Sequence, residues 1–370
     1  MVLNRIKSRM AKAGYARKRA GAFTQPFDKG VRNKVLLLAV DHRIPQSQLF
    51  PFHYYADDLL HEHDIDIREV VMKDYGLPDQ HPTGATTVCY QSNFDISDED
   101  LNRHMAKIRS HNPGARIIYM DWFAPTDLRM AARVLSHVDA YVTKHALRDR
   151  ARYDAPTFGD TTLMDYYGRR YGLDHDDQHF EIPHGFWETF HVGPSFATAD
   201  FMLPTFDKGT LPKGDRPIDL HARIAVDGTP WYQGMRQECA DAVDALHEVK
   251  TVTGTGIRHD LFLREMRKSK LCFSPFGYGE VCWRDYEAVM TGAVLIKQDM
   301  SHVETDPDIF VANETYVPVK WDLSDFETKV RWLLSDDAAR MRIAEAAFQK
   351  LKHYAHSKRF VAQMAEVLLP

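Results

Sequence analysis

The stretch Leu271–Ile296, LCFSPFGYGEVCWRDYEAVMTGAVLI, carries the strongest structural signal in the chain. A short apolar run ends at Ser274, a loop with Pro275, Gly277 and Gly279 follows, and an amphipathic segment leads into a second apolar run. This order predicts a strand, a glycine loop, a helix and another strand. Glycines let backbone amides approach an anion, and the N-terminus of a helix favours negative charge. The stretch therefore predicts a phosphate-binding turn in a parallel α/β sheet.

Three charged side chains are spaced for one face of the helix, which is predicted to begin near Glu280. Glu280, Arg284 and Glu287 stand at positions i, i+4 and i+7. A cation between two carboxylates suits a nucleotide sugar, because arginine pairs with phosphates and carboxylates accept from hydroxyls. The same spacing also fits an ordinary solvent-facing ladder of ion pairs, so spacing alone leaves both interpretations open.

The first half of the chain repeats this alternation of short apolar runs and helix-length stretches. We expect strands at 35–40, 67–72, 86–90, 116–120 and 140–143, and helices at 53–63, 98–110 and 126–136. Between about 154 and 214 the alternation stops, and this segment, rich in Gly, Pro, Asp and aromatic residues, predicts a linker or functional loops.

The second half resumes the alternation. We expect strands at 218–224, 249–252, 271–274 and 293–296, and helices at 231–246, 259–269, 280–290, 338–352 and 358–368. Ser324 and Glu327 form a capping-box pattern for one more helix, through Leu334. The sequence thus predicts an α/β protein with a basic arm at 1–34, a Rossmann-like domain at 35–200, and a second one with terminal helices at 201–370.

The composition is that of a globular protein. The chain has 370 residues, of which 44% are hydrophobic and 27% are charged. No run approaches the roughly 20 apolar residues of a membrane span, and the four cysteines are too few and too scattered for a disulfide framework. We therefore expect a soluble cytoplasmic protein.

Charge is distributed unevenly along the chain. Residues 1–34 hold ten Lys or Arg against one acid, a balance of +9, which leaves the rest at −14 within a total of −5. So acidic a body argues against general nucleic-acid binding. The arm predicts reversible attachment to an anionic membrane surface, at its inner face; a solvated tail is the alternative.

The pattern around the glycine loop resembles the donor-binding half of GT-B glycosyltransferases, most closely the exostosin-like and related families. Their pattern is a helix ending in Ser, a strand, S-P-x-G-x-G, R-x-x-E-A, and a Gly before the next strand. This chain carries it at Ser269, Ser274, Pro275, Gly277, Gly279, Arg284, Glu287, Ala288 and Gly292. A looser likeness extends over about 200–350 and includes Arg223 in a strand and Arg236 on the next helix.

The resemblance implies two Rossmann-like domains facing a cleft, with a nucleotide-diphosphate sugar bound chiefly by the second domain. Arg284 would contact the phosphates and Glu287 the ribose. No catalytic metal and no cofactor is implied, because the nucleotide sugar is the substrate. The donor-binding residues expected from the matched pattern are Arg223, Arg236, Ser274, Pro275, Gly277, Gly279, Glu280, Arg284 and Glu287.

The function implied is transfer of a sugar to a glycan or lipid-linked acceptor in the assembly of polysaccharides or glycoconjugates. Two alternatives remain. A nucleotide-sugar 2-epimerase of the same fold would change the sugar nucleotide without an acceptor. A non-catalytic protein that binds glycan or nucleotide would turn over nothing.

Candidate catalytic bases lie in loops that follow strands of the first domain. An inverting enzyme of this architecture takes its base from the carboxyl end of such a strand. Asp41 and His42 follow the first predicted strand, and Asp121 follows the strand at 116–120. The aromatic segment 184–188, HGFWE, lines the cleft or packs internally.

Overall fold

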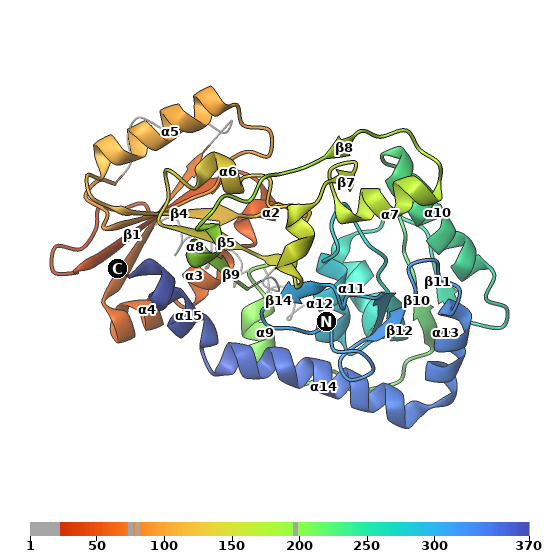
Figure 1. Ribbon diagram of the computed structural model, residues 1–370. Coiled ribbons are helices and arrows are strands. Elements are labelled where there is room, and N and C mark those ends of the chain that lie inside the picture. Colours follow the sequence, from red (N-terminus) through yellow and green to blue (C-terminus); the bar gives the residue numbers. More distant parts are fainter. Residues whose placement is uncertain (1–22, 73–76, 78–81, 195–198, 370) are drawn as a thin grey trace.

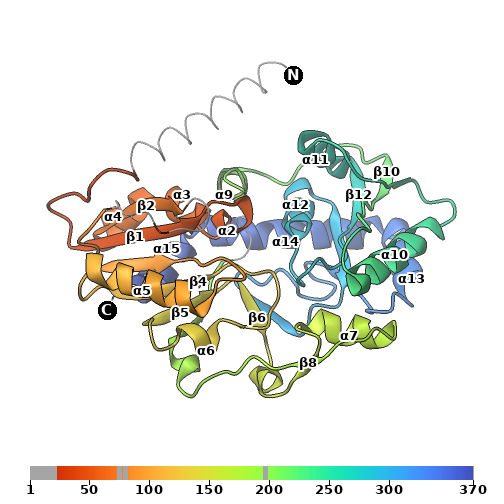
Figure 2. The same ribbon diagram turned by 90° about the horizontal axis from the view of Figure 1, so that it is seen from above.

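The computed structural model describes residues 23–72, 77, 82–194 and 199–369, and two parallel sheets organise them. The sheets lie side by side, each with helices packed against it (Figure 1). Figure 2 shows the two halves from above, with the helix at 337–356 extending along the second half toward the first.

The first sheet has six parallel strands in the order β2-β1-β3-β4-β5-β9. Every predicted strand of this half is present. The strands are β1 (Asn33–Val40), β2 (Ile65–Met72), β3 (Thr87–Tyr90), β4 (Arg116–Asp121), β5 (Ala140–Thr143) and β9 (Phe190–Val192).

Alternate residues of β1 serve two hydrophobic cores, one on each face of the sheet. Leu36 and Leu38 pack on the side of α5 (Asp98–His111) and α6 (Ala131–Val134). Leu37 and Ala39 pack on the side of α3 (Phe50–Tyr54) and α4 (Ala56–His63). Burial on both faces explains why β1 is apolar from Val35 to Val40 without alternation. A short helix, α2 (Arg43–Gln46), follows β1 at the carboxyl edge of the sheet.

The second sheet has five parallel strands in the order β11-β10-β12-β13-β15. They are β10 (Ile218–His221), β11 (Thr251–Val252), β12 (Ser269–Phe273), β13 (Val294–Gln298) and β15 (Val317–Val319). Its helices are α10 (Pro230–Asp244), α11 (His259–Arg267), α12 (Trp283–Thr291), α13 (Phe326–Ser335) and α14 (Asp337–His356).

Two further strands join the halves. β6 (His145–Leu147) of the first half pairs antiparallel with β14 (Val303–Thr305) of the second. Arg150 forms an ion pair with Glu304, and Arg148 lies 3.2 Å from Asp308. Backbone pairing and ion pairs together fix the relative placement of the two sheets.

The last helix, α15 (Arg359–Leu368), returns to the first half. Phe360 is 1% exposed and meets the Phe52 ring edge-on, with 5.0 Å between centroids. The Tyr55 hydroxyl donates to the Ala355 carbonyl at 2.7 Å, and the Thr87 hydroxyl donates to the Leu368 carbonyl at 2.8 Å. The chain's last helix therefore packs on the first half, although the sequence patterns predicted it as part of the second domain, at 201–370.

The glycine loop between β12 and α12 also touches the first half. A Cβ atom added to Gly279 would overlap the carbonyl oxygen of Ala124. At Gly277, by contrast, the nearest atom to such a Cβ would be the Cys282 sulfur at 3.4 Å, an ordinary contact. Gly279 is thus required by a close approach between the halves.

The segments outside the two sheets contain several differences from the sequence-based expectations. The predicted helix at 126–136 shrinks to α6, because Leu128 adopts a left-handed backbone with φ 52°. The segment at 154–214 is more ordered than a linker and contains α7 (Thr162–Arg170), which packs beside α10. Its other elements, with the 3-10 helix just before it, are Arg150–Asp154, β7 (Thr157–Phe158), β8 (Asp177–Gln178), α8 (Phe186–Thr189) and α9 (Met202–Lys208).

The structure describes residues 23–34 of the arm that was expected at 1–34. Phe23 is 6% exposed and lies 4.7 Å from the His53 ring, and β1 already begins at Asn33. Residues 23–34 therefore belong to the folded first half. The predicted membrane contact rests mainly on residues 1–22, which lie outside the described residues.

The capping box predicted for α13 is wrong. Asp325 precedes this helix, and the Ser324 amide instead donates to Asp322 at 3.0 Å. In the described parts of the chain, no helix combines the length and apolar character needed to cross a bilayer.

The packing of α15 predicts a large effect of truncating Phe360. Phe360→Ala should lower the free energy of unfolding by about 3–5 kcal/mol, because it leaves a cavity against Phe52 and Tyr55. Met341→Ala is the matched control, since Met341 is 64% exposed on α14. Urea titrations would measure both variants, and equal midpoints for the two would contradict the packing described.

The contact at Gly279 predicts that alanine is tolerated at one glycine of the loop and not at the other. Gly279→Ala should destabilise the protein by about 1–3 kcal/mol, because the new methyl group overpacks the interface between the halves. Gly277→Ala should change stability by less than about 0.5 kcal/mol. Thermal melts of both variants test this, and a reversed order would refute the placement of the loop.

Candidate functional site

The loop of residues 274–282 reaches α12 later than the sequence predicted. Cys282 is the N-cap of α12, and the Asp285 carboxylate accepts its amide at 2.8 Å in a capping box. Capping from the third helical position requires the preceding residues to be non-helical. Glu280 therefore lies in the loop, and the expectation that it shares a helix face with Arg284 and Glu287 is wrong.

A buried polar network holds this loop against the sheet. Lys297 on β13 and Asp285 are both fully buried, with 3.3 Å between Nζ and Oδ1. The Ser274 hydroxyl donates to the same Asp285 oxygen at 2.6 Å, and Nζ donates to the Ser274 carbonyl at 3.1 Å. Burial raises the pKa of Asp285, while the positive charge of Lys297 opposes that shift. Strand, loop and helix are thereby joined into one rigid unit.

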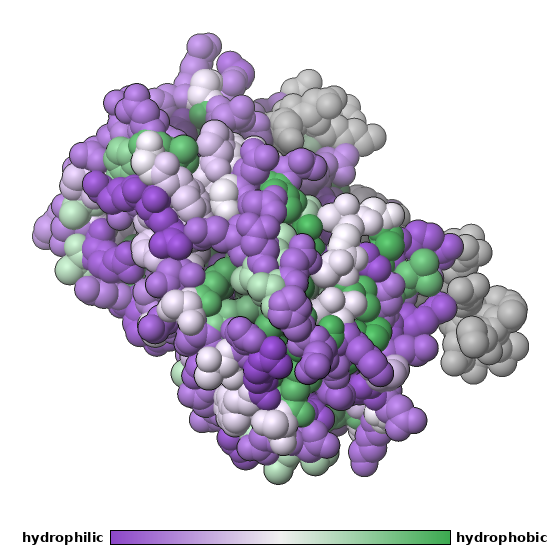
Figure 3. Space-filling model, turned by 90° about the vertical axis from the view of Figure 1, so that its right-hand side faces the viewer, coloured by the Kyte–Doolittle hydropathy of each residue, from purple (hydrophilic) through white to green (hydrophobic). Residues whose placement is uncertain are grey.

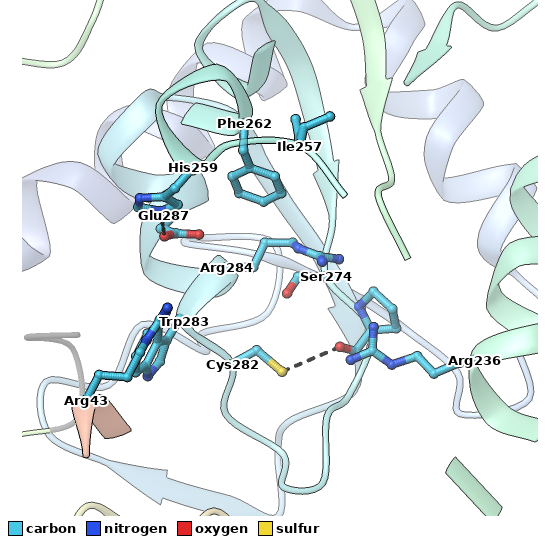
Figure 4. A pocket seen from close by; sticks show the side chains of 11 residues that line it. Arg43, Arg236, Ile257, His259, Phe262, Ser274, Cys282, Trp283, Arg284 and Glu287 are labelled. Atoms are coloured by element: carbon cyan, nitrogen blue, oxygen red, sulfur yellow. Dashed lines mark hydrogen bonds and ion pairs between the residues drawn. The ribbon is translucent and has the colours of Figure 1, made fainter. Parts of the chain in front are cut away.

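A pocket of about 340 Å³ opens at the carboxyl edge of the second sheet, beside α10, α11 and α12 (Figure 4). All of its lining residues except Arg43 come from the second half. They are Arg43, Arg236, Ile257, His259, Phe262, Ser274, Pro275, Cys282, Trp283, Arg284 and Glu287. Figure 3 shows the right-hand side of the molecule, where hydrophilic and hydrophobic residues are mixed over the surface.

Two arginines of the pocket lack an anionic partner. Arg236 is 7% exposed, and its buried Nε has no acceptor. Arg284 also has a buried Nε without an acceptor, and its Nη1 lies a long 3.5 Å from the Phe273 carbonyl. Neither forms an ion pair within the described ranges. Buried donors are normally satisfied, so the two guanidinium groups point to an anionic ligand that completes the site.

The carboxylate of the pocket already has a partner. Glu287 is 6% exposed, and its Oε1 lies 2.6 Å from Nε2 of His259 on α11. Among the described residues, no ion pair joins Glu287 to either arginine. Its second oxygen leaves one acceptor available for a ligand hydroxyl.

Glu280 occupies a different environment, at the junction of the halves. It is 1% exposed, and Oε1 accepts from the Thr126 hydroxyl at 3.2 Å and lies 3.7 Å from Nε2 of His302. Burial raises the pKa of Glu280, but His302 and His145 lower it more, so the net shift is downward. This carboxylate anchors the loop to the first half and does not line the pocket.

The predicted donor residues thus divide into two groups. The pocket unites Arg236, Ser274, Pro275, Arg284 and Glu287. Outside it lie Gly277, Gly279, Glu280 and Arg223, and Arg223 is bound to the Glu265 carboxylate at 2.7 and 3.1 Å.

The candidate bases occupy contrasting positions. Asp121 at the end of β4 is 3% exposed, and its oxygens accept from the Tyr141 hydroxyl at 2.5 Å and the Phe123 amide at 2.9 Å. Burial raises the pKa of Asp121 to about 6. It does not line the pocket. Asp41 and His42 are exposed in the loop that leads to Arg43.

The segment HGFWE packs within the first half. Phe186 is fully buried and meets the Tyr141 ring with 5.0 Å between centroids, and Trp187 lies under the Arg150 guanidinium at 5.3 Å. It contributes no lining residue to the 340 Å³ pocket.

Several pocket residues were not predicted from the sequence, above all Arg43, His259 and Trp283. Trp283 begins α12, and its place beside the glycine loop was visible in the sequence. Arg43 follows the candidate bases Asp41 and His42, but only the three-dimensional arrangement places it at a pocket of the other half. Among the described residues, no group of three or more His, Cys, Asp or Glu side chains could hold a metal ion.

Comparison with known proteins identifies the architecture. No protein-family model and no curated protein matches the chain. An alpha-glucosyltransferase in complex with UDP-glucose and DNA containing an abasic site aligns with a TM-score of 0.51 at 8% identity, over 91% of this chain and 99% of its own. The alpha-glucosyltransferase with UDP and a 13-mer DNA containing a central A:G mismatch gives 0.52 and 9%, over 91% and 100%.

A glycosyltransferase from Rickettsia africae aligns with a TM-score of 0.49 at 8% identity, over 91% of this chain and 98% of its own. The identities are low, so the two alignments above 0.5 show the fold and nothing narrower. The chain has the GT-B fold, with two Rossmann-like halves.

Proposed function

We propose that this protein is a glycosyltransferase that uses a nucleotide-diphosphate sugar as donor. The observation that carries the proposal is the pair of arginines, Arg236 and Arg284, that line one pocket without a carboxylate partner. A diphosphate bridge carries two negative charges, and guanidinium groups bind phosphate oxygens through parallel hydrogen bonds. The two cations therefore match the diphosphate in charge.

The remaining lining residues suit the nucleoside part of such a donor. The free oxygen of Glu287 can accept from a ribose hydroxyl, and Ile257 and Phe262 offer apolar surface to a base. The position at the carboxyl ends of parallel strands is where α/β sheets bind ligands. A protein of the same fold is described with UDP-glucose bound, which supports the same ligand class here.

The acceptor that we propose is a glycan or a lipid-linked sugar. The acidic body of the chain disfavours a nucleic-acid acceptor, although the glucosyltransferase of similar fold is described with DNA. The narrower likeness to exostosin-like families and a cytoplasmic location at the inner face of a membrane remain predictions from the sequence.

Binding measurements test the donor site. Arg284→Gln and Glu287→Gln should each weaken UDP or GDP binding about tenfold or more, because each removes a hydrogen bond with a charged partner. Arg223→Gln is the matched control and should change binding less than threefold, since Arg223 is paired with Glu265 outside the pocket. Calorimetric titration with thermal melts decides the matter: wild-type affinity in folded variants at positions 284 and 287 would refute this donor site.

A turnover assay separates the proposed activity from its alternatives. Nucleotide sugars are incubated with and without glycan and lipid-linked acceptors, and released nucleoside diphosphate is measured. A transferase releases diphosphate in an acceptor-dependent way. Conversion of the sugar nucleotide without an acceptor would instead identify an epimerase, and binding without any turnover would identify a non-catalytic protein.

The base is tested at positions 41 and 121. We propose Asp41, because it is exposed beside Arg43, whereas both oxygens of Asp121 are engaged in the interior. His42 Nδ1 accepts the Ile44 amide at 3.4 Å, which leaves the proton of the neutral ring on Nε2 and makes that nitrogen a donor. Asp41→Asn should reduce turnover about 10²- to 10⁴-fold with UDP binding retained. Asp121→Asn should reduce it less than tenfold, and the opposite ranking would restore Asp121 as the base.

A further inference from the structure

Arg43 is the one pocket residue that the first half supplies. It is exposed on α2, and its guanidinium carbon lies 4.1 Å from the centre of the Trp283 ring at the start of α12. Figure 4 shows Arg43 and Arg236 entering the pocket from opposite sides, with Cys282 and Arg284 between them. No hydrogen bond or ion pair joins Arg43 to another residue of the described ranges. As far as the described residues go, the N–H groups of its guanidinium remain available to a ligand.

Hydrogen bonds to neighbouring strands fix the backbone of the loop that carries Arg43. The Asp41 amide donates to the Met72 carbonyl at 3.3 Å, and the Gln91 side chain donates to the Pro45 carbonyl at 2.9 Å. Gln91 also accepts from the Val40 amide at 3.2 Å and is itself completely buried. These bonds fix the backbone on both sides of Arg43. Its approach to the pocket therefore belongs to the fold of the first half.

The pocket holds more arginines than the intact donor has ionised phosphates. Arg43, Arg236 and Arg284 contribute three cations, and the single carboxylate, Glu287, is paired with His259. A nucleotide-diphosphate sugar has two ionised phosphates. When the bond between the sugar carbon and the terminal phosphate oxygen breaks, the electron pair stays on that oxygen and creates a third negative charge.

We propose that Arg43 binds the terminal phosphate of the leaving nucleoside diphosphate, from the half opposite to the other two arginines. This inference rests on the proposed function. In the transfer, the acceptor hydroxyl oxygen bonds to the sugar carbon, its proton passes to a carboxylate base, and the phosphate oxygen departs with the electron pair. Arg43 matches the charge that appears on that oxygen, so its interaction strengthens as the bond breaks. Trp283 is the positioning residue that keeps the guanidinium at the pocket.

Three ligands distinguish this role from general attraction to an anion. We expect Arg43→Gln to weaken binding of UDP about tenfold at pH 8, the size of one hydrogen bond between charged groups. Binding of UDP-glucose and UMP should weaken less than threefold, because the sugar esterifies the β-phosphate of UDP-glucose and UMP has no β-phosphate. Arg43→Lys should fall between wild type and Arg43→Gln, since it keeps the charge but loses the planar fork. The same series with GDP, GMP and GDP-mannose covers the other common base class.

A double-mutant cycle tests the part played by Trp283. Trp283→Leu should weaken UDP binding in the wild-type background, and should add less than twofold in the Arg43→Gln background, because its effect passes through Arg43. Arg103→Gln is the control for charge, since Arg103 is exposed on α5 with its side chain paired to Asp100. It should leave all affinities within twofold.

The outcomes separate this inference from the proposal on which it rests. If wild type binds UDP or GDP and Arg284→Gln weakens it while Arg43→Gln does not, the donor site stands and the role of Arg43 is refuted. Equal weakening of diphosphate, monophosphate and sugar nucleotide would also refute it, because that result indicates general attraction only. If wild type binds none of these ligands, the proposed function fails and the inference fails with it.

Discussion

The site depends on the buried ion pair between Lys297 and Asp285. Both side chains are fully buried, and Asp285 also caps α12 and accepts from the Ser274 hydroxyl. Removing one partner of a buried pair leaves an uncompensated charge, at a cost of about 3–5 kcal/mol. The Asp285 carboxylate contacts Lys297 on a strand, Ser274 in the loop and Cys282 at the helix start, so the positions of these three elements are coupled. Arg284, one residue before Asp285, takes its place at the pocket from this arrangement.

The second constraint is the fixed relation between the two halves. The β6–β14 pairing, the return of α15 to the first sheet and the contact of Gly279 with Ala124 all act at the junction. Each brings backbone or fully buried side chains together, so none can slide without losing hydrogen bonds or packing. As a result, Arg43 of one half and Trp283 of the other can form a single wall of the pocket.

Sequence patterns predicted the parallel sheets, because the period along one element is a local property. The pocket residues Arg236, Arg284 and Glu287 came from the resemblance to the GT-B donor-binding pattern, since spacing alone left their role open. Sequence patterns failed for Glu280, since the spacing assumed a helix that begins there. The capping box formed by Asp285 delays the helix, and a one-turn error at a helix start moves a side chain from one surface to another. They also failed for Arg43. Its role depends on the placement of two sheets, which no spacing within one half contains.

Three arginines in one pocket have two opposing requirements: their mutual repulsion must be offset, and their N–H groups must stay free to bind a ligand. Like charges in one pocket repel, and an ion pair to relieve them would occupy the N–H groups that a ligand needs. Here each guanidinium instead lies against an aromatic ring, with its carbon 4.1–5.7 Å from the ring centre, and the pairs are Arg43 with Trp283, Arg236 with Tyr232 and Arg284 with Phe262. A ring face stabilises a planar cation through its electrons and accepts none of the in-plane hydrogen bonds. The aromatic contacts therefore leave the guanidinium donors free for the anion that we propose, apart from the long bond of Arg284 to the Phe273 carbonyl, so the aromatic residues of this pocket support the proposed chemistry together with the charged ones.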